Sequence, residues 1–566
     1  MDIDRIFEFC EALFSKAEVN KAQWRDVVSL VFPEIVAAAD VNNPNAIAGA
    51  AANSRTCAHA RTDVLDLSSA KMSYVFPFGH RWFAFKSWLV PQTDADEVTE
   101  EDDAEDWFAG ATETAANELE RSNFYSEMNS VVIDRSATGT GLMLGEMDAT
   151  QSVLEFTHIP AGTYGVEEDA AGRVNTCVRR FSLTIQQMVE KFGYDNCPEE
   201  VQKLFDNVGQ RIQESREIWH LVCPRVENIL YGYAGVVPER RPFVSVYLDL
   251  GSRSILSVGG YYEFPYVCTR FIRVGGQVYG VSPLLTAQDA IRDSMVLDDC
   301  IKMISQRNAM PPVAVPADMV DDIDLGPNGI NVMPLQYIRE QVPREIVSRG
   351  DIRYLLEARQ ADFDEIDAAT YVSVLRTISS QDRYMTATEV NSREAEKVLT
   401  FTPTFVQLQV DFRAFFNRIF ALLMRARKFD TENAPESVIA RAPDENGVQR
   451  EFIINPKVAF VGKMSQAMER VQTNSTRDCL AQHLQLASAT QDPSILANYD
   501  FGKLAHREAL AAGVPKACLR SSRKREQLLK QLQAKQDAAM QSQLIMQQAR
   551  AQKDAATAEN LLQPQA

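Results

Sequence analysis

The feature that most constrains the fold is one long helical pattern enclosed by prolines. It begins at Ser282-Pro283, where a hydroxyl N-cap precedes a proline at the first helical position, and it ends at Pro311-Pro312. Apolar residues recur between these signals at three- and four-residue spacing, at Ala287, Ala290, Ile291, Leu297, Ile301 and Ile304. A helix of roughly 28 residues spans about 40 Å. Such an apolar stripe is buried by packing against other helices.

Two further long helices follow this one. A Pro/Gly-rich stretch with short β runs, 311–343, leads to a second helix at about 345–370. The Ser/Thr-rich segment 373–385 then breaks the helical pattern. Thr386-Ala-Thr-Glu389 forms the capping box of a third helix, in which Pro403 predicts a kink. The centre of the chain is therefore expected to be dominated by long helices.

The flanking regions differ from this helical centre. Residues 1 to about 90 and 107–135 show helical spacing, whereas 140–275 contain short β runs with one helix at Thr184–Phe192. From about 515 the chain is Gln/Ala-rich and has almost no glycine, which favours a helix too polar to bury itself. The pattern predicts an α+β chain that is mainly helical.

Composition excludes several classes of protein. The 566 residues carry 58 basic and 77 acidic side chains, a net charge of −19, which argues against gripping nucleic acid over the whole surface. No apolar run reaches the roughly 18 residues of a membrane helix, so we expect no membrane span. The first twenty residues carry acids and no basic stretch, so we expect no secretion signal. Nine cysteines without a CxxC pair predict free thiols.

No motif predicts an enzyme. The sequence has no GxxxxGK[ST] loop for phosphates, Ser282 does not lie in a GxSxG elbow, and none of the six histidines lies in an HExxH motif. Asp298-Asp299 and Asp321-Asp322 are the pairs that an undetected carboxylate or metal site could use. Adjacent residues on a helix do not face each other, so we expect no catalytic site, no metal and no cofactor.

Several segments, in one order along the chain, resemble the portal proteins of podovirus-type bacteriophages, which are also called head-to-tail connectors. The most specific are Gln277-Val-Tyr-Gly-Val-Ser-Pro283, ending at Pro311-Pro312, and Met385-Thr-Ala-Thr-Glu-Val390. The first departs from the family pattern at Val281, where a basic residue is common. Weaker matches are Trp24–Pro33, Arg81-Trp-Phe83, Ser122–Tyr125, Gly139-Thr-Gly141 and Arg179–Thr184. The resemblance covers about residues 20 to 430.

The resemblance implies a ring of about twelve subunits at one capsid vertex, with double-stranded DNA passing along its axis. An acidic ring with few positive points suits this task, because every phosphate contact adds affinity and hinders sliding. The implied division of the chain is a wing (1–275, α+β), a descending stem helix (276–310), a small α/β clip (311–344), a second stem helix (345–372), a channel or tunnel loop (373–385), a kinked wing/crown helix (386–428), a helical crown region (429–514) and a C-terminal barrel helix (515–566).

Three sets of residues are candidate sites under this resemblance. The channel loop would face DNA with Arg376, Thr377, Ser379, Ser380, Gln381 and Arg383. The clip would dock partners through Asp318, Asp321, Asp322 and Asp324, and the barrel would carry a basic belt of Lys516, Arg520, Arg523, Lys524, Arg525 and Lys530. Three plainer alternatives stay open: the two loop arginines pair with acids of a neighbouring subunit, the clip loop is merely solvated, and the tail is frayed.

The resemblance also implies partners and a location. We expect the ring to meet the major capsid and scaffolding proteins, terminase during packaging and a tail adaptor afterwards, with no membrane partner. It would be assembled in the host cytoplasm and reside in the virion. One alternative is another phage adaptor or collar ring that does not conduct DNA, although adaptors are usually far smaller. A second alternative is a nuclease-like enzyme that uses an undetected carboxylate site.

Overall fold

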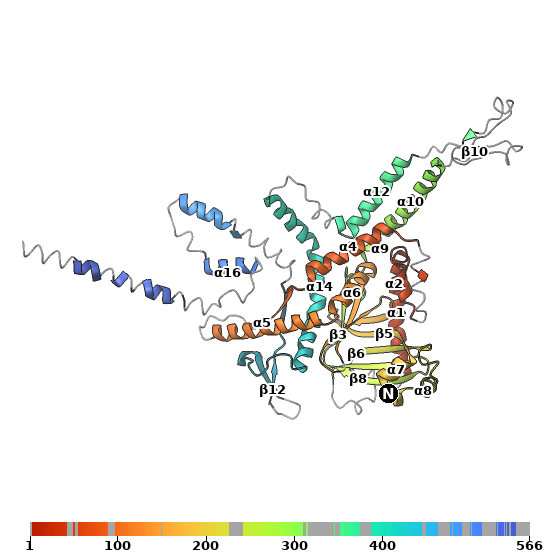
Figure 1. Ribbon diagram of the computed structural model, residues 1–566, viewed down its shortest axis with the longest axis horizontal. Helices are drawn as coiled ribbons and strands as arrows, with labels where there is room; N and C mark the ends of the chain where they lie inside the picture. The colour runs from red at the N-terminus through yellow and green to blue at the C-terminus, as the bar shows by residue number, and fades with distance from the viewer. Residues whose placement is uncertain are drawn as a thin grey trace, which may run out of the picture. The chain divides into compact units, whose positions relative to one another are not determined.

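The computed structural model describes the chain as two compact units that mix helices and strands (Figure 1). Unit 1 contains Met1–His80 and Ala115–Ala426, and unit 2 contains Arg81–Thr114 and Arg427–Ala566. The described residues are 3–41, 49–50, 55–88, 97–148, 150–225, 241–309, 313–314, 344–345, 351–373, 387–443, 449–461, 476–477, 479–489, 499, 501–511, 528, 530–536, 538, 540–542 and 545–550. Among the helices described, none combines the length and apolar character that crossing a bilayer requires.

A five-stranded antiparallel sheet forms the larger β layer of unit 1, in the order β4-β5-β6-β7-β8. Along β6, Trp219 and Leu221 pack with α1, whereas Ile218, directly before Trp219, packs with α7, because successive strand residues point to opposite faces. The elements are α1 (Ile3–Ser29), β4 (Tyr164–Glu168), β5 (Val174–Thr184), α7 (Ile185–Phe192), η1 (Tyr194–Asn196), α8 (Glu199–Asp206), β6 (Ser215–Pro224), β7 (Phe243–Asp249) and β8 (Ser254–Tyr261).

A second sheet of three strands, in the order β3-β2-β9, joins this layer. Its strands are β2 (Thr140–Met147), β3 (Leu154–Ile159) and β9 (Tyr266–Arg270), and α6 (Phe124–Thr138) leads directly into β2. The turn between α6 and β2 requires Gly139, whose φ of 91° is left-handed. A side chain at Gly139 would also collide with the backbone of Gly280, so two glycines distant in sequence lie back to back.

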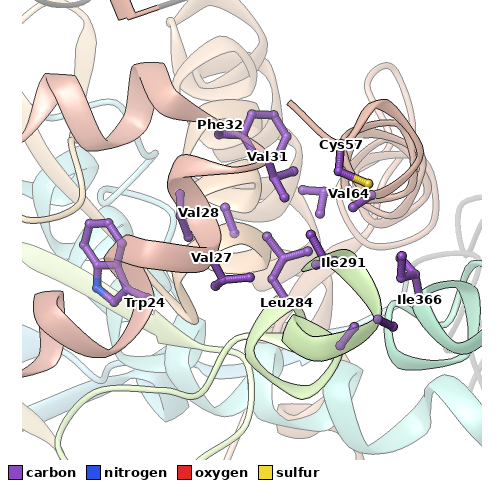
Figure 2. Packing of buried hydrophobic residues seen from close by; sticks show 14 of the residues in the cluster. Trp24, Val27, Val28, Val31, Phe32, Cys57, Val64, Leu284, Ile291 and Ile366 are labelled. Atoms are coloured by element: carbon purple, nitrogen blue, oxygen red, sulfur yellow. The ribbon is translucent and has the colours of Figure 1, made fainter. Parts of the chain in front are cut away.

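A helical core joins the N-terminal region to the central helices. The helices are α2 (Pro33–Ala38), α4 (Ala58–Val75), α9 (Pro283–Thr286), α10 (Gln288–Ala309) and α12 (Ile352–Ala369). Figure 2 shows Leu284 and Ile291 facing Val28, near the end of α1, and Val31, just after it, with Ile366 of α12 nearby. The apolar stripe predicted from sequence therefore begins in the core of unit 1.

The third long helix, α14 (Ala387–Arg425), crosses the rest of unit 1. Its second half buries Leu408, Phe412, Phe415, Phe416, Ile419, Phe420 and Leu423. The ring centroid of Phe412 lies 5.2 Å from that of Phe76, which follows α4. The predicted helix is confirmed and is continuous through Pro403; the kink remains a prediction.

Unit 2 is smaller and pairs segments that are far apart in sequence. Strand β1 (Phe83–Lys86) pairs antiparallel with β14 (Lys457–Phe460), and Trp107 Nε1 donates to Asp430 O at 2.8 Å. The proposed wing and crown boundaries remain predictions. They assign β1 to the wing and β14 to the crown region, and no sequence pattern predicted that these two strands pair. The other elements are α5 (Glu97–Arg121), which continues into unit 1, η4 (Glu436–Val438), β12 (Ile439–Pro443), β13 (Gln449–Ile453) and α16 (Phe501–Ala511).

Candidate assembly site

The α10–α12 pair forms an arm that extends from unit 1 (Figure 1). Helix α10 leads to β10 (Val313–Ala314), which pairs antiparallel with β11 (Arg344–Glu345), and α12 returns. The predicted second helix does not start at 345: residues 344–345 are β-strand, and the helix begins at Ile352 after Asp351, whose side chain accepts from Arg353 N. The two helices consequently run in opposite directions.

The start of the arm is fixed by the predicted N-cap, which is confirmed. Ser282 is fully buried; its Oγ accepts from Leu284 N at 3.0 Å and donates to Ala137 O, at the end of α6, at 2.7 Å. The prediction of one unbroken helix from Pro283 is wrong in detail, because Ala287 leaves helical geometry (φ −98°, ψ 14°) between α9 and α10. Ser282 therefore both starts α9 and links the start of the arm to the end of α6.

Ion pairs hold the inner part of the arm. Arg359 of α12 lies 2.9 Å from Asp298 of α10, whereas the neighbouring Asp299 pairs with Arg55. Arg55 also donates to Met295 O at 2.9 Å. The two adjacent aspartates therefore engage different arginines, as expected for neighbours on a helix, and do not converge on one ligand position.

Among the described residues of the arm, the outer part of the two helices is little buried. The buried residues of α10 are Ala290, Ile291 and Ser294, all near its start, and α12 buries Ile366, near its end. Further out, the predicted stripe residues Leu297, Ile301 and Ile304 are half-buried. Other apolar side chains point to solvent: Val296 is 60% exposed, Met303 53% and Tyr354 71%. These three residues, which we call the arm patch, are a candidate assembly surface.

Buried charges anchor α14 to the three-stranded sheet. Arg418 donates to Gly145 O from Nε and Nη2, both at 3.1 Å, and to Glu263 O at 3.0 Å. Asp411 accepts from Arg270 N at 3.1 Å, and burial raises the pKa of its carboxyl. The guanidinium of Arg135 donates in turn to Arg270 O at 2.8 Å. These bonds join α14 to the three-stranded sheet.

A buried lysine lies next to this network. Lys71 of α4 donates to Ser136 Oγ at 3.1 Å and lies over the Phe271 ring at 4.2 Å. Burial, and next the charge of Arg135, hold the pKa of its amine well below the usual range. The sequence motifs do not predict these buried cations; Arg418, within an apolar run, is the available signal.

Most sequence-predicted site residues lie outside the described part of the chain. This holds for Arg376, Thr377, Ser379, Ser380, Gln381 and Arg383 of the channel loop, for Asp318, Asp321, Asp322 and Asp324 of the clip, and for Lys516, Arg520, Arg523, Lys524 and Arg525 of the belt. Lys530 is described and is helical and exposed. Among the described residues, one group brings metal-ligand types together, namely His59, Asp63 and Asp367.

Comparisons with known proteins assign the chain to a family. The model of the family described as "Bacteriophage head to tail connecting protein" matches residues 4–519. The chain is 26% identical over 471 residues to the "Probable portal protein" of Bordetella phage BPP-1, covering 81% of this chain and 80% of that protein. It is 23% identical over 384 residues to the "Portal protein" of Salmonella phage epsilon15, covering 64% and 67%.

One solved structure is similar at a low level. It is titled "Neck of empty GTA particle computed with C6 symmetry", with 12% identity, a TM-score of 0.28, and coverage of 53% of this chain and 68% of that one. A TM-score this low adds nothing to the assignment, which rests on the family match over residues 4–519. By that match, the chain with the two-helix arm belongs to the family of bacteriophage head to tail connecting proteins.

Proposed function

We propose that this chain is the subunit of a closed ring of about twelve copies at one capsid vertex, through which double-stranded DNA is packaged and ejected. The observation that carries the proposal is the arm, whose outer apolar side chains the single chain leaves exposed. In a ring, each arm lies between two others, so the same side chains are buried against neighbours.

The negative charge of the chain favours a channel that DNA passes through over a protein that binds DNA tightly. The chain carries −19, so a ring of such chains presents a largely acidic surface. Affinity for duplex DNA rises with every phosphate that a cation neutralises, and an acidic wall keeps the number of such contacts low. The ring acts without catalysis, and we expect the purified protein not to hydrolyse ATP.

The test of ring formation removes the apolar character of the arm patch. Val296→Asp with Met303→Asp is expected to leave the subunit folded but to yield monomers or open fragments, whereas the unchanged chain forms rings with a central hole. Val208→Asp is the matched control, because Val208 is also exposed, at 72%, but lies outside the arm. Mass photometry and negative-stain imaging measure both. Rings formed equally well by the double variant contradict the proposal.

The proposed channel loop, 373–385, supplies the DNA contacts of the ring. Replacing Arg376 and Arg383 with alanine is expected to preserve the ring, change packaging efficiency or DNA retention, and leave free-solution DNA affinity nearly unchanged. Thr377, Ser379, Ser380 and Gln381 add weak donors to phosphate. A double variant that packages and retains DNA normally removes the loop arginines from this role. Loss of assembly shows instead that they pair between subunits.

The proposed clip, 311–344, docks terminase during packaging and a tail adaptor afterwards. Its acidic residues Asp318, Asp321, Asp322 and Asp324 meet basic surfaces on these partners. Reversing the four charges is expected to keep the ring and weaken docking, measured by co-sedimentation with each partner. Unchanged docking removes the acidic edge from the proposal.

The proposed C-terminal barrel, 515–566, places Lys516, Arg520, Arg523, Lys524, Arg525 and Lys530 as a positive belt inside the head. Polar helices of this kind are marginal alone and gain stability from neighbours on both sides. Truncation after Ser521 is expected to preserve rings but to impair packaging or ejection in a complementation assay. Loss of the ring itself assigns assembly to the tail rather than to the arm.

A ring that does not conduct DNA is the alternative function. Such a ring forms the same assembly with capsid, scaffolding and tail proteins in the virion, but DNA does not pass through it. The test is to fix a plug across the centre of the ring, which would then leave DNA packaging unchanged. Blocked packaging by such a plug supports the channel, and unaffected packaging supports the adaptor or collar ring.

A further inference from the structure

A compact cluster of metal-ligand types lies at the base of the arm. His59 and Asp63 are one turn apart on α4, and Asp367 lies in the last turn of α12. His59 Nε2 lies 2.9 Å from Asp367 Oδ1 and 3.6 Å from Asp63 Oδ2. One donor atom from each of the three side chains lies within 4.8 Å of the others. Two separate helices therefore direct three ligand atoms at one position.

Packing holds the cluster in a defined orientation. The imidazole of His59 stacks on the ring of Phe363, one turn before Asp367 on α12, with centroids 4.0 Å apart and an interplanar angle of 13°. Asp63 is fully buried, whereas His59 and Asp367 keep 22% and 16% of their side-chain surface exposed. The position is consequently rigid on its inner side and open to solvent on its outer side.

The three side chains combine one imidazole with two carboxylates. A single imidazole nitrogen faces both carboxylates, and a proton on it makes a hydrogen bond at 2.9 Å but not at 3.6 Å. A divalent cation in contact with all three ligands would neutralise both carboxylates and leave the imidazole uncharged as a ligand.

We propose that His59, Asp63 and Asp367 form a divalent-metal site that ties α4 to the base of the arm. One imidazole nitrogen and two carboxylate oxygens are a donor set that Zn²⁺ accepts, with a fourth position left for water. The exposed side of the cluster provides that position. The site is independent of the ring proposed above, because all three ligands come from one chain.

The experiment measures Zn²⁺ binding by the full-length protein after treatment with EDTA and dialysis. The unchanged chain is expected to bind Zn²⁺ at this site, and Asp367→Asn or His59→Gln to weaken that binding by about tenfold or more, since even loss of an outer partner of a ligand costs that much. His158→Gln is the matched control: its Nε2 lies 2.8 Å from Asp134 in a similar pair that belongs to no three-ligand group among the described residues. The control variant is expected to bind Zn²⁺ like the unchanged chain.

Co²⁺ absorption identifies the ligands. A site of nitrogen and oxygen ligands gives a visible d–d spectrum without a thiolate charge-transfer band, and the proposal requires this spectrum to be lost in Asp367→Asn. A thermal scan without metal establishes that both variants are folded. The proposal is overturned if the unchanged chain binds no Zn²⁺, if Asp367→Asn and His59→Gln bind it equally well, or if the spectrum reports thiolate ligands.

Discussion

The sheet of unit 1 and the arm bury their apolar residues in different ways. In the sheet, α1 supplies Phe7 and Cys10 to a core with Trp219, and the rings of Phe7 and Trp219 lie 5.5 Å apart. In the arm, comparable side chains such as Val296 and Met303 remain exposed beyond the first turns. The sheet region is therefore stabilised by contacts within the chain, whereas the outer arm presents an apolar surface suited to contact with another molecule.

The largest expected difference comes from truncating one apolar side chain in each region. Phe7→Ala leaves a cavity in the sheet core and is expected to lower the free energy of unfolding by about 3–5 kcal/mol. Met303→Ala is expected to change the same quantity by at most about 0.5 kcal/mol in unassembled subunits. Urea unfolding at low protein concentration measures both. Equal losses would mean that the arm is as self-sufficient as the sheet.

Buried charge gives a smaller effect in the body of unit 1. Arg418→Met removes the donors to Gly145 O and Glu263 O and is expected to cost about 2–3 kcal/mol of unfolding free energy. Arg413→Met on the exposed face of α14 is the control, with an expected change of at most about 0.5 kcal/mol. If Arg418→Met caused no loss of unfolding free energy in the same denaturation assay, these bonds would be dispensable.

The start of the arm is expected to respond at an intermediate level. Ser282→Ala loses the N-cap and the bond to Ala137 O, at a cost of about 1–2 kcal/mol. Ser305→Ala, on the exposed outer part of α10, should leave stability unchanged. Differential scanning calorimetry compares the two. A Ser282 variant as stable as the control would place the anchorage of the arm elsewhere.

The smallest expected effect is a pH dependence inside the body. Burial alone lowers the pKa of His158, but its hydrogen bond to Asp134 and the charge of that carboxylate outweigh burial and raise the pKa. Because the folded value exceeds the unfolded value of about 6.5, this stabilisation is complete below that pH and is lost as pH rises through the folded value. The stability difference between the unchanged chain and His158→Gln should therefore shrink as pH rises above about 6.5 and through the raised folded pKa. A difference that is constant across this range would contradict the assignment.

The sequence predicted the long elements well because their signals are local. The cap at Ser282, the stripe through Ala290 and Ile291, and the helix at Thr184–Phe192 are each predicted from a few neighbouring residues, and the structure confirms them. The break at Ala287 was missed because no glycine or proline marks it. Helix α8 was missed as well, because its eight residues bury only Val201.

The sequence could not predict contacts that depend on distant segments. His59, Asp63 and Asp367 show no motif, since the third ligand lies on another helix far along the chain. Arg135 and Lys71 have ordinary sequence neighbours, and only the fold shows that they are buried together. The candidate residues of the channel loop, the clip and most of the belt rested on resemblance and remain predictions.

The pairing of β1 with β14 has a consequence for biosynthesis. On the ribosome, Phe83 and Phe85 emerge long before their strand partners Phe460 and Val458 are translated. Until then, an apolar strand with unpaired edges is available to other nascent chains, which is a liability for aggregation. The β1–β14 pairing of unit 2 cannot form until β14 has been translated. Premature termination after α14 therefore yields a chain with its β1 edge unprotected, which the host's folding and degradation machinery can recognise.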